Sequence, residues 1–520
     1  MMKTSNNLNS GLRGLFTALL CVSMFSCSDF FNPEQDLIQE KDEHYNSLDK
    51  VRRATVGAYA GLQPLVESLI VMGDLRADLL VTTQNYDADL LEIDKHEISA
   101  NNPYASPDPF YDVILDCNDI LANLEKSAVD PKMTELKIEA YEAEIRTIRA
   151  WVYLQLAQTF KEVPMVKESL DGHFPGYEPR VYDFSTMLNW LVKELEWANE
   201  KSRLDWTALD ENPVWKKVYI NRKALLGELY LLTGNFNASV DVLKDCILND
   251  GNDADEDVLK CAPVSGTSAW KRSWFKIKDG VSGFEHLSVI PFAKDQRQTN
   301  RLMNLFSNDK IHRYVLKPSR VAVAKWEAQE LKDGSGILEG DLYRGQLASY
   351  AVMDKDTIVY KYQVGKSVNQ NDAVHTIYRA ADLHLLLAEA LNQSGQSEDA
   401  LKVINEKTVG VKESVGIRGR VGLKPVRMVD LKDQNPALAS DEKALVELAL
   451  LEERAMEFAF EGRRWNTLVR FADRAGAPLI LAERVASKYK QNDPQLYARL
   501  KEKLSSQDNW KLVMPELKKD

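Results

Sequence analysis

Cysteine and histidine are scarce in this sequence, and their scarcity excludes several classes of protein. The chain has five cysteines and seven histidines in 520 residues. The histidines form no HExxH motif and the cysteines form no CxxC motif, so the usual patterns of zinc ligands are missing. Only Cys117, Cys246 and Cys261 lie in the body of the chain. Cys246 and Cys261 could pair, but the fold must depend on a packed core rather than on a disulfide framework.

Long apolar segments are also missing. An apolar run from Leu15 to Phe25 follows the basic residues Lys3 and Arg13. It has only about half of the roughly 20 residues that a membrane-spanning helix needs. A basic start followed by a short apolar run is typical of a secretory signal peptide. No other segment is expected to cross a membrane.

Cys27 stands where such a peptide would be cleaved, directly after Ser26. Bacterial lipoproteins are acylated at a cysteine in this position, so we expect residues 1–26 to be removed and Cys27 to carry the lipid. The polar, acidic residues 27–43 would form a flexible tether. Phe25 departs from the small residue that usually stands two places before the lipidated cysteine. An ordinary secreted protein with an incidental cysteine is the alternative.

The chain is acidic, with a formal net charge of -12, which argues against nucleic acid as a partner. An acidic loop has Asp253, Asp255 and Asp257 at alternate positions, as at the start of a calcium-binding loop. Val258 replaces the glycine that such a loop needs, which favours a solvated acidic turn. We therefore expect no metal and no other cofactor.

Apolar residues recur at three- and four-residue steps along most of the chain, which predicts a mostly helical fold. The stretch 250–377 is richer in Gly, Pro and short strand-like pieces such as 287–290, and 82–109 is expected to be loop-rich. Residues 44–520 are expected to form one domain, with helices over 44–249 and 378–520 and a loop-rich ligand face over 250–377. The expected helices cover 111–126, 135–160, 182–201, 221–249 and 378–406, with others starting at Ser47 and after Ser440. We expect Ser440 to be the N-cap of the last of these, and Gly462 to break or kink it.

Two segments repeat one pattern of small and large residues. Small residues at Gly227 and Ser239 have counterparts at Ala388 and Ala400, and a glycine lies between the members of each pair. This spacing is typical of tetratricopeptide helix pairs, in which small residues let two helices approach closely. The copies are too far apart in sequence to predict a continuous array. The fold class is therefore an irregular tetratricopeptide-like scaffold with a loop-rich region on one face.

Three carboxylates raise the question of catalysis. Glu453, Glu457 and Glu461 are spaced four residues apart on one helical face. Paired carboxylates can hydrolyse glycosides, but carboxylates at this spacing more often pair with arginines. The sequence has no phosphate-binding glycine loop and no nucleophile elbow. We therefore predict that the protein is not an enzyme, with a surface glycoside hydrolase as the alternative to be tested.

Several longer motifs lie in order along nearly the whole chain. They are CSDFF at 27–31, ATVGAYAGL at 54–62, EIRTIRAWVY at 144–153, ERAMEFAFEGRRW at 453–465 and WKLVMPE at 510–516. Together they resemble the SusD/RagB family of outer-membrane nutrient-binding lipoproteins. The resemblance implies a lipid-anchored protein on the outer membrane, facing the cell exterior. It also implies a TonB-dependent transporter of the SusC kind as partner, to which the protein delivers an oligosaccharide or, in some members, a peptide.

Aromatic residues in loops are the best candidates for ligand contacts, because a ring can stack on the flat face of a sugar at little cost in rotamer entropy. In the family, the sugar site draws on an early loop and on a middle segment. Here we call 82–109 the early loop and 250–377 the middle segment, so candidate residues from these two stretches could converge. For Trp270 and Trp274, anchoring the loop to the core is the alternative, and a scaffold that recruits only proteins is the alternative function. The candidate residues are Tyr86, Asn101, Tyr104, Trp270, Arg272, Trp274 and Trp326.

Overall fold

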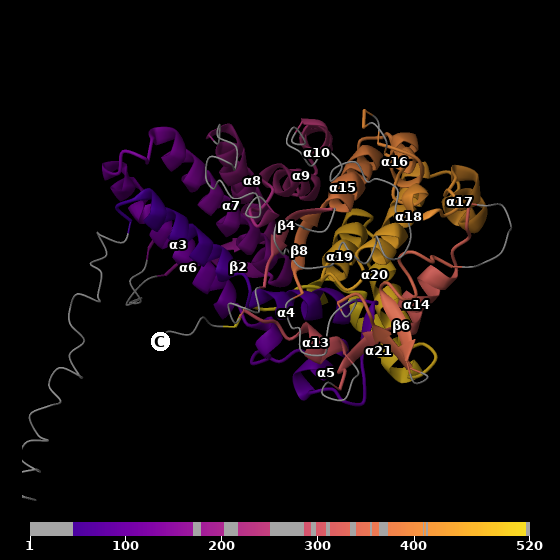
Figure 1. Cartoon of the computed structure of the whole chain (residues 1–520). Helices are drawn as coiled ribbons and strands as arrows, with labels where there is room; N and C mark the ends of the chain where they lie inside the picture. Colours follow the sequence, from indigo (N-terminus) through magenta and orange to yellow (C-terminus); the bar gives the residue numbers. More distant parts are fainter. Residues whose placement is uncertain are drawn as a thin grey trace, which may run out of the picture.

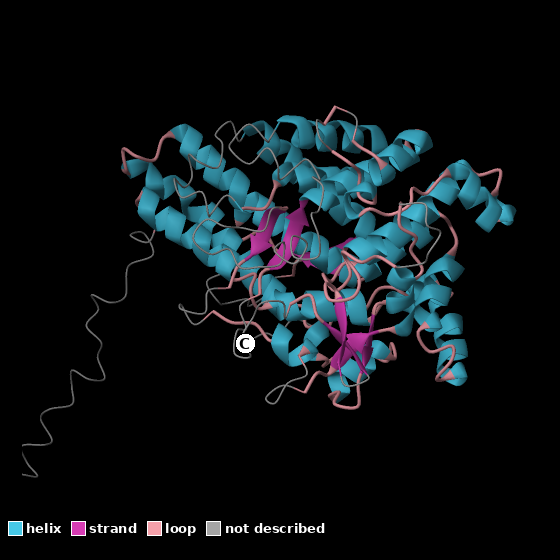
Figure 2. Cartoon of the chain, turned by 45° about the vertical axis from the view of Figure 1, so that its right-hand side comes forward, coloured by secondary structure: helices cyan, strands magenta, loops and turns pink. Residues whose placement is uncertain are grey.

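The computed structural model describes residues 45–169, 178–201, 217–249, 285–292, 298–307, 313–332, 340–353, 356–362, 373–408, 410–411 and 414–515. Helices dominate these residues, and their named strands form two-stranded pairs. The prediction of a mostly helical fold is confirmed. Figure 1 shows a row of helices along the upper side, with shorter helices and strands beneath it. Figure 2 shows the strands in two places between these layers.

The upper row follows chain order, and its neighbours pack against one another. Its members are α3 (Leu48–Ala60), α6 (Asp108–Asn123), α7 (Glu135–Thr159), α8 (Phe184–Lys201), α9 (Arg222–Leu232), α10 (Phe236–Asn249), α15 (Ala380–Gln393), α16 (Ser397–Asn405) and α18 (Glu442–Glu457). The lower side contains α4 (Leu65–Ile70), α5 (Ala88–Asp94), α13 (Leu302–Phe306), α14 (Arg320–Glu327), α19 (Arg464–Arg474), α20 (Pro478–Ser487) and α21 (Pro494–Leu504). Helix α17 (Met428–Gln434) packs on α18 at the upper right in Figure 1.

The predicted close helix pairs are present. A Cβ atom on Gly227 would lie 2.6 Å from Leu243 of α10, and the Ser239 hydroxyl donates to the Gly227 carbonyl at 2.8 Å. Gly234 and Gly395 turn the chain between the helices with φ of +78° and +85°, a region that glycine enters without steric cost. Small residues therefore set the helix spacing, as the repeat predicts.

The two repeats are neighbours in space, which differs from the sequence expectation. Helix α10 packs directly on α15, although residues 250–379 separate them in the chain. Local sequence spacing could not reveal this contact, because the intervening segment leaves the row and returns to it. The helical parts before and after the middle segment thus form one scaffold.

Short strands attach the middle segment to both parts of the scaffold. Strand β1 (Leu80–Thr82) pairs antiparallel with β5 (Leu316–Pro318), and β4 (His286–Ile290) pairs with β8 (His375–Arg379). The strand predicted at 287–290 is confirmed as part of β4. The other pairs are β2 (Glu162–Met165) with β3 (Arg180–Asp183), and β6 (Tyr350–Met353) with β7 (Asp356–Val359).

One sequence expectation needs correction. Asp441, rather than Ser440, caps α18 by accepting from the Ala444 amide at 2.9 Å. That helix ends at Glu457, and Gly462 lies in the turn that follows with φ of +79°. The loop-rich stretch 82–109 also contains α5, which starts where Asp87 accepts a hydrogen bond from the Leu90 amide.

One run, Leu48–Leu75, is long and apolar enough to span a membrane by length and composition, and half of its most apolar window is buried in the fold. Its residues Val51, Leu65 and Ile70 are almost completely buried. Within this run α3 packs on α6 and α7. A core helix passes the same test of composition, and the burial fits that interpretation.

Two glycines allow a close backbone contact between the early and late parts of the chain. A Cβ atom on Gly73 would lie 1.9 Å from the carbonyl oxygen of Gly462. Gly462 has φ of +79°, and its own Cβ would lie 2.7 Å from the Leu69 carbonyl oxygen. Only glycine fits at either position, so this crossing fixes α4 against the turn between α18 and α19.

Replacing Gly73 with Ala should destabilise the protein by about 3 kcal/mol or more, because backbone atoms at 1.9 Å cannot move aside as a side chain could. Urea unfolding followed by circular dichroism measures the change. Gly57→Ala is the matched control: Gly57 lies within α3 with nothing within 4 Å of its Cβ direction. That variant should be more stable by up to about 1 kcal/mol. Equal effects of the two substitutions would contradict the close contact.

Candidate functional site

The early loop and the middle segment converge, as the candidate ligand site requires. The β1–β5 pair brings them together, and residues that follow β1 also contact the middle segment. The Thr83 hydroxyl and the Asn85 amide both donate to the Tyr314 carbonyl, at 2.8 and 3.2 Å. Figure 1 shows α4, α5 and α13 gathered at this lower edge.

A cluster of polar and aromatic side chains forms where these segments meet. The Tyr104 hydroxyl donates to Glu67 at 3.1 Å, and Arg301 of the middle segment lies 3.5 Å from the same carboxylate. The Arg301 side chain is 65% exposed. Burial raises the pKa of Glu67, with a further contribution from the Asp87 carboxylate, although Arg301 and Tyr104 oppose it. We call Glu67, Asp87, Tyr104 and Arg301 the early-loop cluster, and the exposed Tyr86 directly precedes Asp87 in the chain.

The predicted ligand residues differ in their exposure to solvent. Tyr86 is 46% exposed and Asn101 is exposed, so both are accessible. Tyr104 is largely buried, and only its hydroxyl end reaches the early-loop cluster. Contact of these residues with a ligand stays a prediction. Some predicted residues lie outside the described part of the chain, namely Cys27, Trp270, Arg272 and Trp274. The acidic loop at 253–257 and Cys261 also lie outside it.

The structure corrects the prediction that Trp326 contacts the ligand. The sequence predicts a loop aromatic there, but Trp326 lies in α14 and is 1% exposed. Its ring packs 5.5 Å from the Tyr350 ring and 6.0 Å from the Phe460 ring. The surrounding core therefore covers both faces that a sugar would need.

Sequence reasoning missed Glu67 and Arg301. Neither belongs to a motif, and each is an ordinary charged residue in its own segment. Only the tertiary contact at 3.5 Å gives them a shared role. The sequence predicted that the two segments would converge, but it did not indicate which residues would meet there.

The three carboxylates of α18 and the following turn are buried and ion-paired. Glu453 accepts from Arg344 at 2.6 Å and from Arg418 at 2.9 Å. Glu457 accepts from Arg344 at 2.9 Å and from Arg379 at 2.6 Å, and it also pairs with Arg420. We call these residues, with Glu461, Lys361 and Glu285, the buried ion network.

The buried ion network favours a structural role for these carboxylates. Burial alone would raise the pKa of Glu457, but Arg420, Arg379 and Arg344 hold it well below its usual value. In the same way Arg379 and Lys361 lower the pKa of Glu461 to about 2. A general acid needs a raised pKa, so these groups do not suit glycoside hydrolysis. The ion-pair interpretation from the sequence is confirmed, with partners far along the chain.

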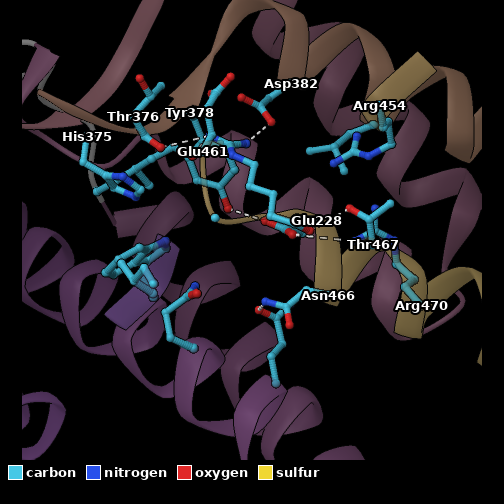
Figure 3. Close-up of a pocket in the computed structure, with 18 residues that line it drawn as sticks. Glu228, His375, Thr376, Tyr378, Asp382, Arg454, Glu461, Asn466, Thr467 and Arg470 are labelled. Carbon is cyan, nitrogen blue, oxygen red and sulfur yellow. Dashed lines mark hydrogen bonds and ion pairs between the residues drawn. The ribbon is translucent and has the colours of Figure 1, made fainter. Parts of the chain in front are cut away.

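A polar pocket of about 70 Å³ lies next to this network. Figure 3 shows side chains of β8 and of the turn between α18 and α19 around it. Asn466 donates to Gln158 of α7 at 2.8 Å across one side, and Tyr378 donates to Glu228 at 2.5 Å on another. A second pocket beside it shares Leu69 and Gln155 and includes Tyr104. The volume admits a small polar group but not a sugar ring.

Comparisons with known proteins agree with this architecture. Residues 343–516 match the family model described as the SusD family. The chain is 22% identical over 482 residues to SusD-like protein P38 of Formosa agariphila, covering 86% of this chain and 88% of that protein. SusD-like protein P2 of the same organism is 22% identical over 490 residues, with coverage of 87% and 89%.

Solved structures share the fold. A SusD superfamily protein from Bacteroides thetaiotaomicron has a TM-score of 0.65 at 19% identity, covering 89% of this chain and 94% of that one. A SusD-like carbohydrate binding protein from Bacteroides fragilis has a TM-score of 0.59 at 16% identity, with coverage of 84% and 88%. The chain therefore shares the helical fold of SusD superfamily proteins, and its late part matches the SusD family model. Over most of its length it is similar to SusD-like proteins.

Replacing Glu461 with Gln should cost about 3–5 kcal/mol at pH 7, because Arg379 and Lys361 would lose part of their buried counter-charge. The Glu461 pKa is lowered from 4.5 to about 2. Its stabilising contribution is therefore complete above about pH 4.5 and is lost as the pH falls towards about 2. Urea unfolding of both proteins across this range should show their difference shrinking in acid.

Asp399→Asn is the control for this test, since Asp399 pairs with Lys402 on the surface and exposed pairs contribute little. It should leave the unfolding midpoint unchanged. A Glu461→Gln protein as stable as the wild type would contradict the importance of the network.

Proposed function

We propose that this protein is a cell-surface lipoprotein that binds oligosaccharides and delivers them to a TonB-dependent outer-membrane transporter. Similarity to the SusD family supports the proposal, since one solved protein of similar fold is described as carbohydrate binding. The lipid would be attached at Cys27, beyond a signal peptide over residues 1–26. The protein would act as one domain over residues 44–520, without catalysis and without a cofactor.

The observation that best supports ligand binding is the early-loop cluster. It combines the carboxylates of Glu67 and Asp87 with the exposed guanidinium of Arg301, and the exposed ring of Tyr86 directly precedes Asp87 in the chain. Aromatic rings contact the flat C–H face of a sugar, and charged groups bond its hydroxyl rim. The cluster is built from two chain segments. One is the early part of the chain, and the other is the loop-rich region, which contains Arg301. This arrangement fits an extended surface ligand better than a small enclosed one.

Tyr86→Ala should weaken glycan binding about tenfold, because one stacking contact contributes about 1.4 kcal/mol. Isothermal titration of the purified mature protein with a panel of neutral oligosaccharides and peptides measures this. Tyr182→Ala is the control, since Tyr182 is a half-buried tyrosine of β3 in a separate strand pair. Binding of peptides alone would favour the peptide alternative. No binding across the panel would favour a protein-recruiting scaffold.

Cys27→Ala should release the protein from the membrane fraction, because no lipid could then be attached through sulfur. Fractionation of cells that make each protein, with mass spectrometry of the amino terminus, measures this. The lipid anchor is contradicted if the wild-type protein has an unmodified amino terminus or is recovered in the periplasmic extract. Co-purification of a transporter with the wild-type protein tests the partner.

A further inference from the structure

Arg454 is unusual among the buried arginines of the described chain. It is 5% exposed, and its Nε and Nη1 atoms have no hydrogen-bond partner among the described residues. Its guanidinium carbon lies 5.0 Å from the centre of the Phe458 ring. By contrast, the neighbouring Arg470 makes a two-point contact with Glu389 at 2.8 and 2.9 Å. A buried guanidinium without a carboxylate is costly, since each unmet donor loses its hydration.

Arg454 lines the polar pocket described above, and other unmet polar atoms share that pocket. The Nδ1 atom of His375 and the hydroxyl of Thr376 are buried there and also have no hydrogen-bond partner among the described residues. Figure 3 shows Arg454 on the α18 side and both of these residues on the strand side. Unmet donors and acceptors on both sides of one pocket indicate a ligand with several polar atoms.

The carboxylates around the pocket are already engaged. Asp382 pairs with Arg463 and accepts from the Arg379 amide at 3.0 Å. Glu228 accepts from Tyr378, and Glu461 is held by Arg379 and Lys361. Each of these carboxylates has its own donors, and none forms an ion pair with Arg454 among the described residues, although the charges of Glu389 and Asp382 favour its charged form. Burial, and then the charge of Arg470, lower the Arg454 pKa to about 10.

We propose that the pocket around Arg454 binds a carboxylate group, carried either by a uronic-acid unit of a glycan or by a free small acid. A guanidinium offers two parallel N–H groups that match the two oxygens of a carboxylate. The volume of about 70 Å³ is less than the roughly 150 Å³ of a cavity that binds benzene. It therefore admits the carboxylate, with any sugar ring outside. The uronic-acid form of this inference rests on the proposed glycan binding.

The test is the midpoint of thermal unfolding of the purified mature protein at pH 7 with sodium acetate, sodium glucuronate, glucose or sodium chloride at equal concentration. Acetate and glucuronate should both raise the midpoint, by about 2 °C for a carboxylate that is present at a hundredfold excess over its dissociation constant, and by more for the one that binds more tightly. Glucose and chloride should not. A larger rise with glucuronate than with acetate identifies a sugar acid as the source, and equal rises identify a free acid. No rise with either carboxylate, or an equal rise with chloride, overturns the proposal.

Arg454→Met should abolish the rise while the protein still folds, because the substitution removes a buried charge that has no carboxylate partner. Arg454→Lys keeps a cation and should retain a smaller rise. Arg53→Met, on the exposed face of α3, should leave the rise unchanged. An undiminished rise in Arg454→Met places the carboxylate elsewhere and overturns the proposal. Binding of neutral glycans that depends on Tyr86 is measured separately, so either idea can fail alone.

Discussion

The buried ion network is the constraint on which the rest of the structure depends. Glu457 is fully buried and lies between Arg344, Arg379 and Arg420. Moving such charges out of water is costly, and only a complete set of partners offsets that cost. The partners come from the middle segment, from β8 and from the loop before α17. The network can therefore form only when these segments have assembled on α18, and it holds the loop-rich region to the helical scaffold.

The scaffold presents two sites of different character. Short strands bring the early loop and the middle segment to one surface, where Tyr86 and Arg301 are exposed. The polar pocket is narrow and lies among α7, β8 and the turn that follows α18. An exposed ring with charged neighbours suits an extended ligand, and a narrow pocket lined by an arginine suits one charged group. Both sites depend on contacts between segments far apart in the chain.

Local patterns predicted the helices well, because apolar spacing and capping residues act within a few residues of one another. The Gly227–Ser239 repeat correctly predicted a close helix pair, since its small side chains are themselves the cause of the close approach. The prediction was wrong where burial decided the outcome. Trp326 looks like a loop aromatic in sequence, but α14 places it against Tyr350 and Phe460 in the core.

The sequence by itself determined the helical class and the family motifs, because each is encoded in local spacing. Only the tertiary structure decided which charges meet. Glu457 finds Arg379 and Arg344, Glu67 finds Arg301, and Arg454 finds no carboxylate among the described residues. The physical reason is that an ion pair requires proximity in space, and for residues many turns apart only the packing of the whole chain sets that proximity.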